Sequence, residues 1–169
     1  MKHLLSILFA ALVGSALAQS KTTESLAKKY DASTFFFYNN TLRMINQVED
    51  PAFDEVIKDI EKMKILLIKK DPATLNYKKV VDDYKAESFE EMMTSRHDGK
   101  SFDVYVREKN NKTAGMLVLI NDTSNLFVLD IVGSIALNKV MTLYNTLDKS
   151  SDFGSKLREF TEDKNEKKD

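Results

Sequence analysis

The sequence predicts a single α+β domain built mainly on an antiparallel sheet, and three observations support this. Two stretches that follow an Asp-Pro-Ala tripeptide have the apolar spacing of amphipathic helices. The region from about 90 to 132 alternates short apolar runs with turn residues, as a four-strand antiparallel meander does. Residues 19–160 contain no linker rich in Pro, Gly or Ser that would divide two domains. We therefore expect one domain with its amphipathic helices packed on one face of the sheet.

The first 18 residues have the pattern of a secretory signal peptide. Basic Lys2 precedes an apolar run, Leu4–Val13, and small residues end at Ala18. This run has about half the length that a membrane-spanning helix needs, so a retained anchor is the less favoured alternative. We therefore expect cleavage between Ala18 and Gln19, no membrane anchor, and a protein exported to the periplasm or secreted.

Helix starts come next along the mature chain. Asp50-Pro51 and Asp71-Pro72 each combine a carboxylate that accepts hydrogen bonds from free backbone amides with a proline that lacks a donor. Both should therefore begin helices, and a third helix should lie near residue 140. Their apolar positions are Phe53, Val56, Ile57 and Ile60, then Tyr77, Val80, Val81 and Tyr84, then Leu137, Val140, Met141 and Tyr144. Shorter helices are expected over about 22–29 and 40–48.

Strands are predicted at 35–38, at 64–68 and in the meander. Asp98-Gly99 and Asn110-Asn111 both suit two-residue hairpin turns, and 121–125 suits a five-residue loop. These turns pair Met93 with Val104 in the first hairpin. They also predict one buried face, made of Met93, Phe102, Val104, Val106, Leu117, Leu119, Phe127, Leu129 and Ile131.

The opposite face of the meander mixes apolar and charged side chains, which makes it the candidate binding face. Its distinctive residues are Tyr105, Asp103, Arg107, Met116 and Asp130. An apolar centre beside charges is typical of a ligand or partner surface. The favoured alternative is that another segment covers this face, for example the strand at 35–38 with its neighbouring helix.

The C-terminal half resembles the uncharacterised exported bacterial family known as domain of unknown function 4252. The resemblance lies in the segments FEEMM (89–93), HDGK (97–100), FDVYVR (102–107), GMLVLI (115–120) and LDIVGSIAL (129–137). It implies a small envelope protein of Gram-negative bacteria, often a lipoprotein, without an established activity or functional residues. This chain has no cysteine, so it lacks the cysteine to which a lipoprotein's lipid is attached.

Most catalytic and cofactor chemistries lack the residues they need. His97 is the only histidine after residue 18 and adjoins a predicted turn, so a histidine-based triad or metal site has little to build on. The absence of cysteine excludes thiolate metal sites, and no glycine-rich phosphate loop is present. We therefore expect no catalytic residue, no cofactor and no metal site.

Two hypotheses about function remain from the sequence. The favoured one is an exported, non-catalytic envelope protein that binds a protein partner or a small apolar ligand, with homo-oligomerisation left open. The alternative is a hydrolase that uses two carboxylates. Near-balanced charge, with 25 basic and 26 acidic residues, argues against a nucleic-acid partner. Residues 161–169 alternate in charge without apolar periodicity, which predicts a disordered tail.

Overall fold

A computed structural model describes residues 19–45, 51–70, 74–140 and 142–143. The predicted leader at 1–18 and the charged tail at 161–169 lie outside the described residues. The elements, in chain order, are α1 (Lys21–Lys29), β1 (Ser33–Tyr38), α2 (Asn39–Ile45), α3 (Pro51–Ile57), β2 (Ile60–Lys69), α4 (Tyr77–Ala86), β3 (Glu90–His97), β4 (Lys100–Lys109), β5 (Lys112–Asn121) and β6 (Asn125–Gly133). Residues 137–140 and 142–143 are also helical.

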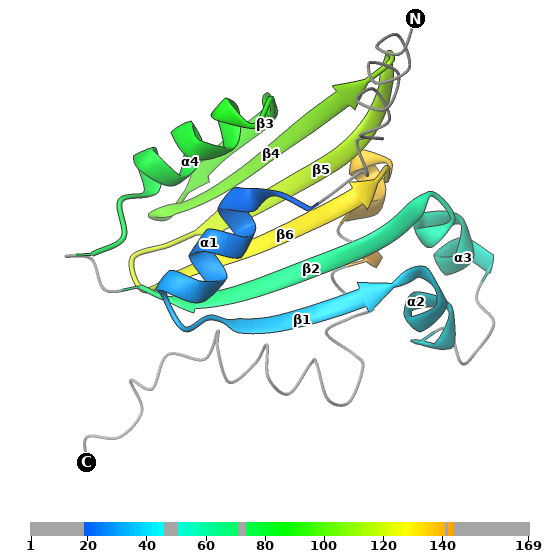
Figure 1. Ribbon diagram of the computed structural model, residues 1–169, viewed down its shortest axis with the longest axis horizontal. Coiled ribbons are helices and arrows are strands. Elements are labelled where there is room, and N and C mark those ends of the chain that lie inside the picture. The colour runs from blue at the N-terminus through cyan, green and yellow to red at the C-terminus, as the bar shows by residue number, and fades with distance from the viewer. Residues whose placement is uncertain (1–18, 46–50, 71–73, 141, 144–169) are drawn as a thin grey trace, which may run out of the picture.

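The strands form one six-stranded sheet in the order β1-β2-β6-β5-β4-β3, and all neighbours are antiparallel. The predicted four-strand meander is confirmed as β3 to β6. β2 pairs with β6 and brings β1 to the outer edge, so the last strand in sequence lies near the middle of the sheet (Figure 1). The α+β fold class is therefore confirmed, with a larger sheet than the meander alone.

Both faces of the sheet are buried. One face, called here the α3 face, packs Ile65, Val118 and Leu129 against Phe53 and Val56 of α3. The other, called the α1–α4 face, packs Leu66, Leu119 and Val128 against Leu26 of α1 and against Val80 and Tyr84 of α4. Figure 1 shows α1 crossing in front of β6 and β2. The sheet is thus the middle layer of three.

The predicted helices are found with one change of start. α1 matches the helix expected at 22–29, and α3 begins at Pro51 as predicted. The expected start at Asp71-Pro72 is wrong, because the helix begins at Tyr77. Asn76 caps α4, since its side chain accepts a hydrogen bond from the Lys79 amide at 3.1 Å. The third helix is present at 137–140, and its predicted later positions lie outside the described residues.

The two hairpin turns are confirmed, but the register beyond the second is wrong by one residue. Met93 pairs with Val104, and the residues at both turns have positive φ angles. In the second hairpin Arg107 pairs with Gly115 while Glu108 pairs with Thr113, so Ala114 is an extra, bulged residue. A bulge of this kind turns the rest of β5 over.

The bulge corrects the predicted buried face. Leu117 and Leu119 lie on the α1–α4 face and not on the α3 face, where the sequence predicts them. Met116, Val118 and Ile120 lie on the α3 face in place of these leucines. The loop before β6 is correspondingly shorter than predicted, because Asn121 pairs with Leu126. The helices also divide between the two faces: α3 and the helical residues near 140 pack where predicted, whereas α4 packs on the opposite side.

Candidate functional site

The structure brings four of the five predicted binding-face residues to the α1–α4 face. Tyr105, Asp103 and Asp130 are buried there, and the guanidinium of Arg107 lies 4.8 Å from the centre of the Phe89 ring. Met116 is the exception: it faces the α3 side because of the bulge at Ala114. The predicted binding role of this face stays a prediction.

This face is covered, as the alternative expected, but by different elements. The strand at 35–38 forms β1 at the edge of the sheet and does not lie over the meander. The cover is instead α1 and α4, which place Leu26, Val80 and Tyr84 over the strands. A ligand therefore reaches this region only where the two helices leave room between them.

The N-terminus of α1 is held by two carboxylates from distant parts of the chain. Ser20 caps the helix, and its own amide donates to Oδ2 of Asp130 on β6 at 3.0 Å. Glu87, which ends α4, accepts from the amides of Lys21 (2.9 Å) and Thr22 (2.6 Å) and from the hydroxyls of Ser20 and Thr22. Free amides at a helix N-terminus favour negative charge, so both carboxylates stabilise α1.

The two carboxylates have opposite pKa shifts. Burial raises the pKa of Asp130, even though the Thr23 hydroxyl, the Ser20 amide and Arg107 act in the other direction. Burial also acts to raise the pKa of Glu87, but the hydrogen bonds from Thr22, Lys21 and Ser20 outweigh it and the net pKa is lowered. Glu87 is therefore stabilised as a charged cap, whereas Asp130 lacks enough compensation for its charge.

A buried lysine connects α1 to β2. Lys64 is 1% exposed, and its Nζ donates to Oε1 of Glu24 at 2.7 Å. The same ammonium lies 4.8 Å from the centre of the Phe36 ring on β1. The lysine is thus held by α1 on one side and by the edge strand on the other.

Asp103 is the centre of a second polar cluster, which connects α4 to the outer strands. Its carboxylate accepts hydrogen bonds from Tyr77, Thr94 and Arg96. Burial opposes the charge, but these donors together lower the pKa of Asp103. Burial, aided by Asp103, raises the pKa of neighbouring Tyr105 to about 12. Every oxygen of Asp103 is engaged, so this cluster is a structural connection.

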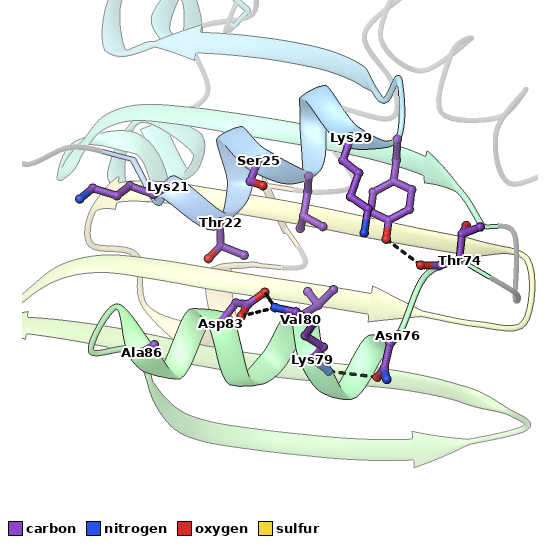
Figure 2. Close-up of a pocket in the computed structure, with 12 residues that line it drawn as sticks. Lys21, Thr22, Ser25, Lys29, Thr74, Asn76, Lys79, Val80, Asp83 and Ala86 are labelled. Carbon is purple, nitrogen blue, oxygen red and sulfur yellow. Dashed lines mark hydrogen bonds and ion pairs between the residues drawn. The ribbon is translucent and has the colours of Figure 1, made fainter.

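A groove of about 420 Å³ lies between α1 and α4. Figure 2 shows the two helices facing each other across it, with Thr22 and Ser25 on the α1 side and the Lys79–Asp83 ion pair on the α4 side. Leu26 and Val80 supply its apolar lining. Tyr30 also lines the groove, and its hydroxyl donates to the Thr74 carbonyl oxygen at 3.0 Å.

Of the described residues, three lysines and a single carboxylate line the groove. Asp83 is the one carboxylate among its lining residues, and it is paired with Lys79 at 2.7 Å. In the described parts of the chain no three His, Cys, Asp or Glu side chains gather as metal ligands would. His97 is highly exposed beside its turn. Nor is any helix of the described part long and apolar enough to cross a bilayer.

The family model described as Domain of unknown function (DUF4252) matches residues 28–143. The chain belongs to this family. The match covers the whole sheet of this DUF4252 protein, together with Lys64, Glu87 and Asp130, while most of α1 precedes it. No curated protein and no solved structure matches the chain.

In this DUF4252 protein, sequence reasoning identified Asp103 and Asp130 but missed Lys64, Glu87 and Ser20, which fasten α1 to its neighbours. Lys64 carried a usable signal, because a lysine within the apolar strand MKILLI must find a partner when both faces are buried. Glu87 and Ser20 carried none, since an acid at a helix end and a serine near the N-terminus are ordinary surface residues. Their importance depends on contacts 67 residues apart in sequence.

Proposed function

We propose that this protein is an exported, non-catalytic binding protein whose ligand occupies the α1–α4 groove. The observation that supports the proposal is the groove itself, whose volume of about 420 Å³ falls in the range of small-molecule sites. It replaces the open sheet face as the binding surface, because α1 and α4 cover that face.

The lining favours a small amphiphile with a negatively charged group. Leu26 and Val80 offer apolar contact, while Ser25 and Thr22 offer hydroxyls. Of the three lysines in the lining, Lys79 is paired with Asp83, and Lys21 extends away from the groove in Figure 2. Lys29 is the remaining cation, and its ammonium lies 4.9 Å from the centre of the Tyr30 ring. An apolar chain against the helices with its anionic head near Lys29 satisfies both parts of the lining.

The arrangement of acids supports binding over hydrolysis. A carboxylate-based hydrolase needs two acids that face a common substrate, about 5 to 10 Å apart. Glu87 uses its oxygens on the N-terminus of α1, and Asp130 is buried beneath that helix. The hydrolase alternative therefore has no supporting observation among the described residues.

Titration of the chain from Gln19 onwards with dodecanoate tests the ligand class. We expect saturable binding to the wild type, with weaker binding of the uncharged dodecanol. Lys29→Gln should weaken dodecanoate binding about fivefold, which corresponds to about 1 kcal/mol. Lys28→Gln is the matched control, because it removes the same charge from the same helix outside the groove.

A groove-filling variant gives an independent test. Ser25→Trp should abolish dodecanoate binding, whereas Lys28→Trp should leave it unchanged. Equal binding by both variants, or no dodecanoate binding by the wild type, would contradict the groove as a small-ligand site. Fractionation of the native cells, with the mass of the exported chain, tests export: it should begin at Gln19 and carry no lipid.

A further inference from the structure

Asp130 is a buried carboxylate with one oxygen left without a hydrogen-bond partner among the described residues. Its side chain is 1% exposed, and Oδ2 accepts from the Ser20 amide at 3.0 Å. Within the described part of the chain Oδ1 is buried without a hydrogen-bond partner, and so is Nε2 of Gln19. An uncompensated buried carboxylate oxygen is costly, so this position calls for another donor.

Two cations of the described part of the chain lie near Asp130, and neither hydrogen-bonds to its Oδ1. Lys64 lies directly across from it on β2, yet its ammonium binds Glu24. Arg107 places its guanidinium over the Phe89 ring, and its charge lowers the pKa of Asp130 without filling the place beside Oδ1. The charged and titratable groups around Asp130 and Ser20 are Glu24 of α1, Lys64 of β2, Tyr84 of α4, Glu87 after α4 and Arg107 of β4.

The predicted cleavage creates a cation one residue away from this carboxylate. Hydrolysis of the Ala18–Gln19 peptide bond by a signal peptidase adds one water, leaving a carboxylate on Ala18 and an α-ammonium on Gln19. Three bonds separate that nitrogen from the Ser20 amide nitrogen, so the two lie within about 4 Å. Rotation about the Cα–C bond of Gln19 moves the ammonium while the Ser20 amide stays on Oδ2.

We propose that leader cleavage completes a binding site in the fold, in which the new α-ammonium of Gln19 is held by the free oxygen of Asp130. The ammonium adds a positive charge next to the Ser20 amide, which already donates to the Asp130 carboxylate. The processed chain thereby gains a partner for Asp130 that the precursor lacks, and α1 is fastened more firmly over the sheet. The pairing rests on the cleavage that belongs to the proposed export, and not on the ligand groove.

Titration of the α-amine tests the pairing. A chain produced to begin at Gln19, with its amine labelled by ¹³C-methylation, should show an amine pKa about one unit above the ordinary 7.7–8.0. Asp130→Asn should return this pKa to the ordinary range. Asp103→Asn is the matched control. It also removes a buried carboxylate from this sheet face, but the Asp103 carboxylate binds Tyr77, Thr94 and Arg96, none of which belongs to α1.

Two further arms keep the outcome clear if Asp130→Asn does not fold. A chain beginning at Ala16 moves the amine three residues away and should have an ordinary amine pKa and a lower melting temperature. Gln19→Ala, which cannot cyclise, should keep the raised pKa. An ordinary pKa in the chain beginning at Gln19 would overturn the pairing.

The native protein supplies the last check. Cyclisation of Gln19 would join its α-nitrogen to its side-chain carbonyl carbon and release ammonia, which removes the ammonium. A native mass short of one ammonia would overturn the ammonium pairing in the native protein, and a native chain that begins elsewhere would overturn the proposed processing site. Neither result would affect dodecanoate binding, so this failure is distinct from failure of the groove.

Discussion

Both faces of the sheet bury a cluster of apolar side chains, but they hold their helices by different forces. The α3 face is a continuous apolar cluster. The buried polar side chains of the described residues gather instead on the α1–α4 face, where Lys64, Asp103 and Asp130 lie beneath α1 and α4. The α3 face therefore depends mainly on apolar burial, whereas the cover formed by α1 and α4 also depends on charge and hence on pH.

Truncation of one leucine on each face should have the largest effect and should show no difference between the faces. Leu119 on the α1–α4 face and Leu129 on the α3 face are both buried. Each change to alanine should cost about 2–5 kcal/mol through lost burial and a residual cavity. Denaturant melts measure both, and a loss below about 1 kcal/mol for Leu119→Ala would contradict its burial beneath α1 and α4.

Removal of the Asp103 carboxylate should come next in size, and it has no counterpart on the α3 face. Asp103→Ala leaves the hydroxyls of Tyr77 and Thr94 without their acceptor, at a cost of about 2–3 kcal/mol. Arg96 contributes less, because over half of its side chain is exposed and water replaces the carboxylate. A melt indistinguishable from wild type would show that the cluster does not hold α4.

Loss of the Glu87 cap should have a smaller effect that depends on pH. Because the folded-state pKa of Glu87 is lowered, its contribution is present above the ordinary pKa of a glutamic acid and is lost as the pH falls through the folded value. Glu87→Gln should cost about 1 kcal/mol at neutral pH and reduce the loss of stability in acid. Exposed Glu90→Gln is the control, and an equal pH profile for both variants would contradict the capping role.

Asp130 should change the stability with pH in the opposite direction to Glu87. Its folded-state pKa is raised, so the folded protein binds this proton more tightly than the unfolded chain does. Stability should therefore fall as the pH rises from the ordinary aspartate value through the folded one. The measurement is the melting temperature of Asp130→Asn against wild type across pH 3 to 7, in chains that begin at Ala16 and so carry no ammonium on Gln19. The difference should become more favourable to the variant as the pH rises.

The smallest effect is expected on the outer surface of α4. Lys78 forms an ion pair with Asp82 at 3.1 Å, and its side chain is 87% exposed. Lys78→Ala should change stability by less than about 0.5 kcal/mol, because solvent and salt screen such pairs. A larger loss in denaturant melts would show that α4 packs with this side toward other parts of the protein.

The β3–β4 and β4–β5 hairpins show how far the sequence can predict this fold. In β4, Phe102 and Val104 alternate with Asp103 and Tyr105. The sequence itself therefore separates the apolar face of this strand from its more polar face. The run 116–120 in β5 is apolar throughout, and both faces of the sheet are buried. Either orientation of β5 buries the same kinds of side chain, so nothing in that run reveals the bulge at Ala114.

The site was less predictable than the fold, for a different reason. Asp103 and Asp130 attract attention because charges are rare within apolar strands. The position of α1, however, depends on Ser20 meeting Asp130 across 110 residues of sequence, and no local pattern encodes that distance. The groove follows from this placement, so its residues could not be found before the helices were placed.

The edge strand β3, at the opposite side of the sheet from β1, affects how copies of this protein can meet. Nearly all of its side chains are exposed, and it carries Glu90, Glu91 and Arg96 along an edge that would otherwise offer backbone groups to another chain. Charged side chains on an edge strand disfavour the addition of a further strand, since pairing would bring them together and strip their water. Pairing of two copies strand to strand through β3 is therefore disfavoured, and the other edge of the sheet, β1, does not carry the same protection along its exposed Phe36 and Tyr38.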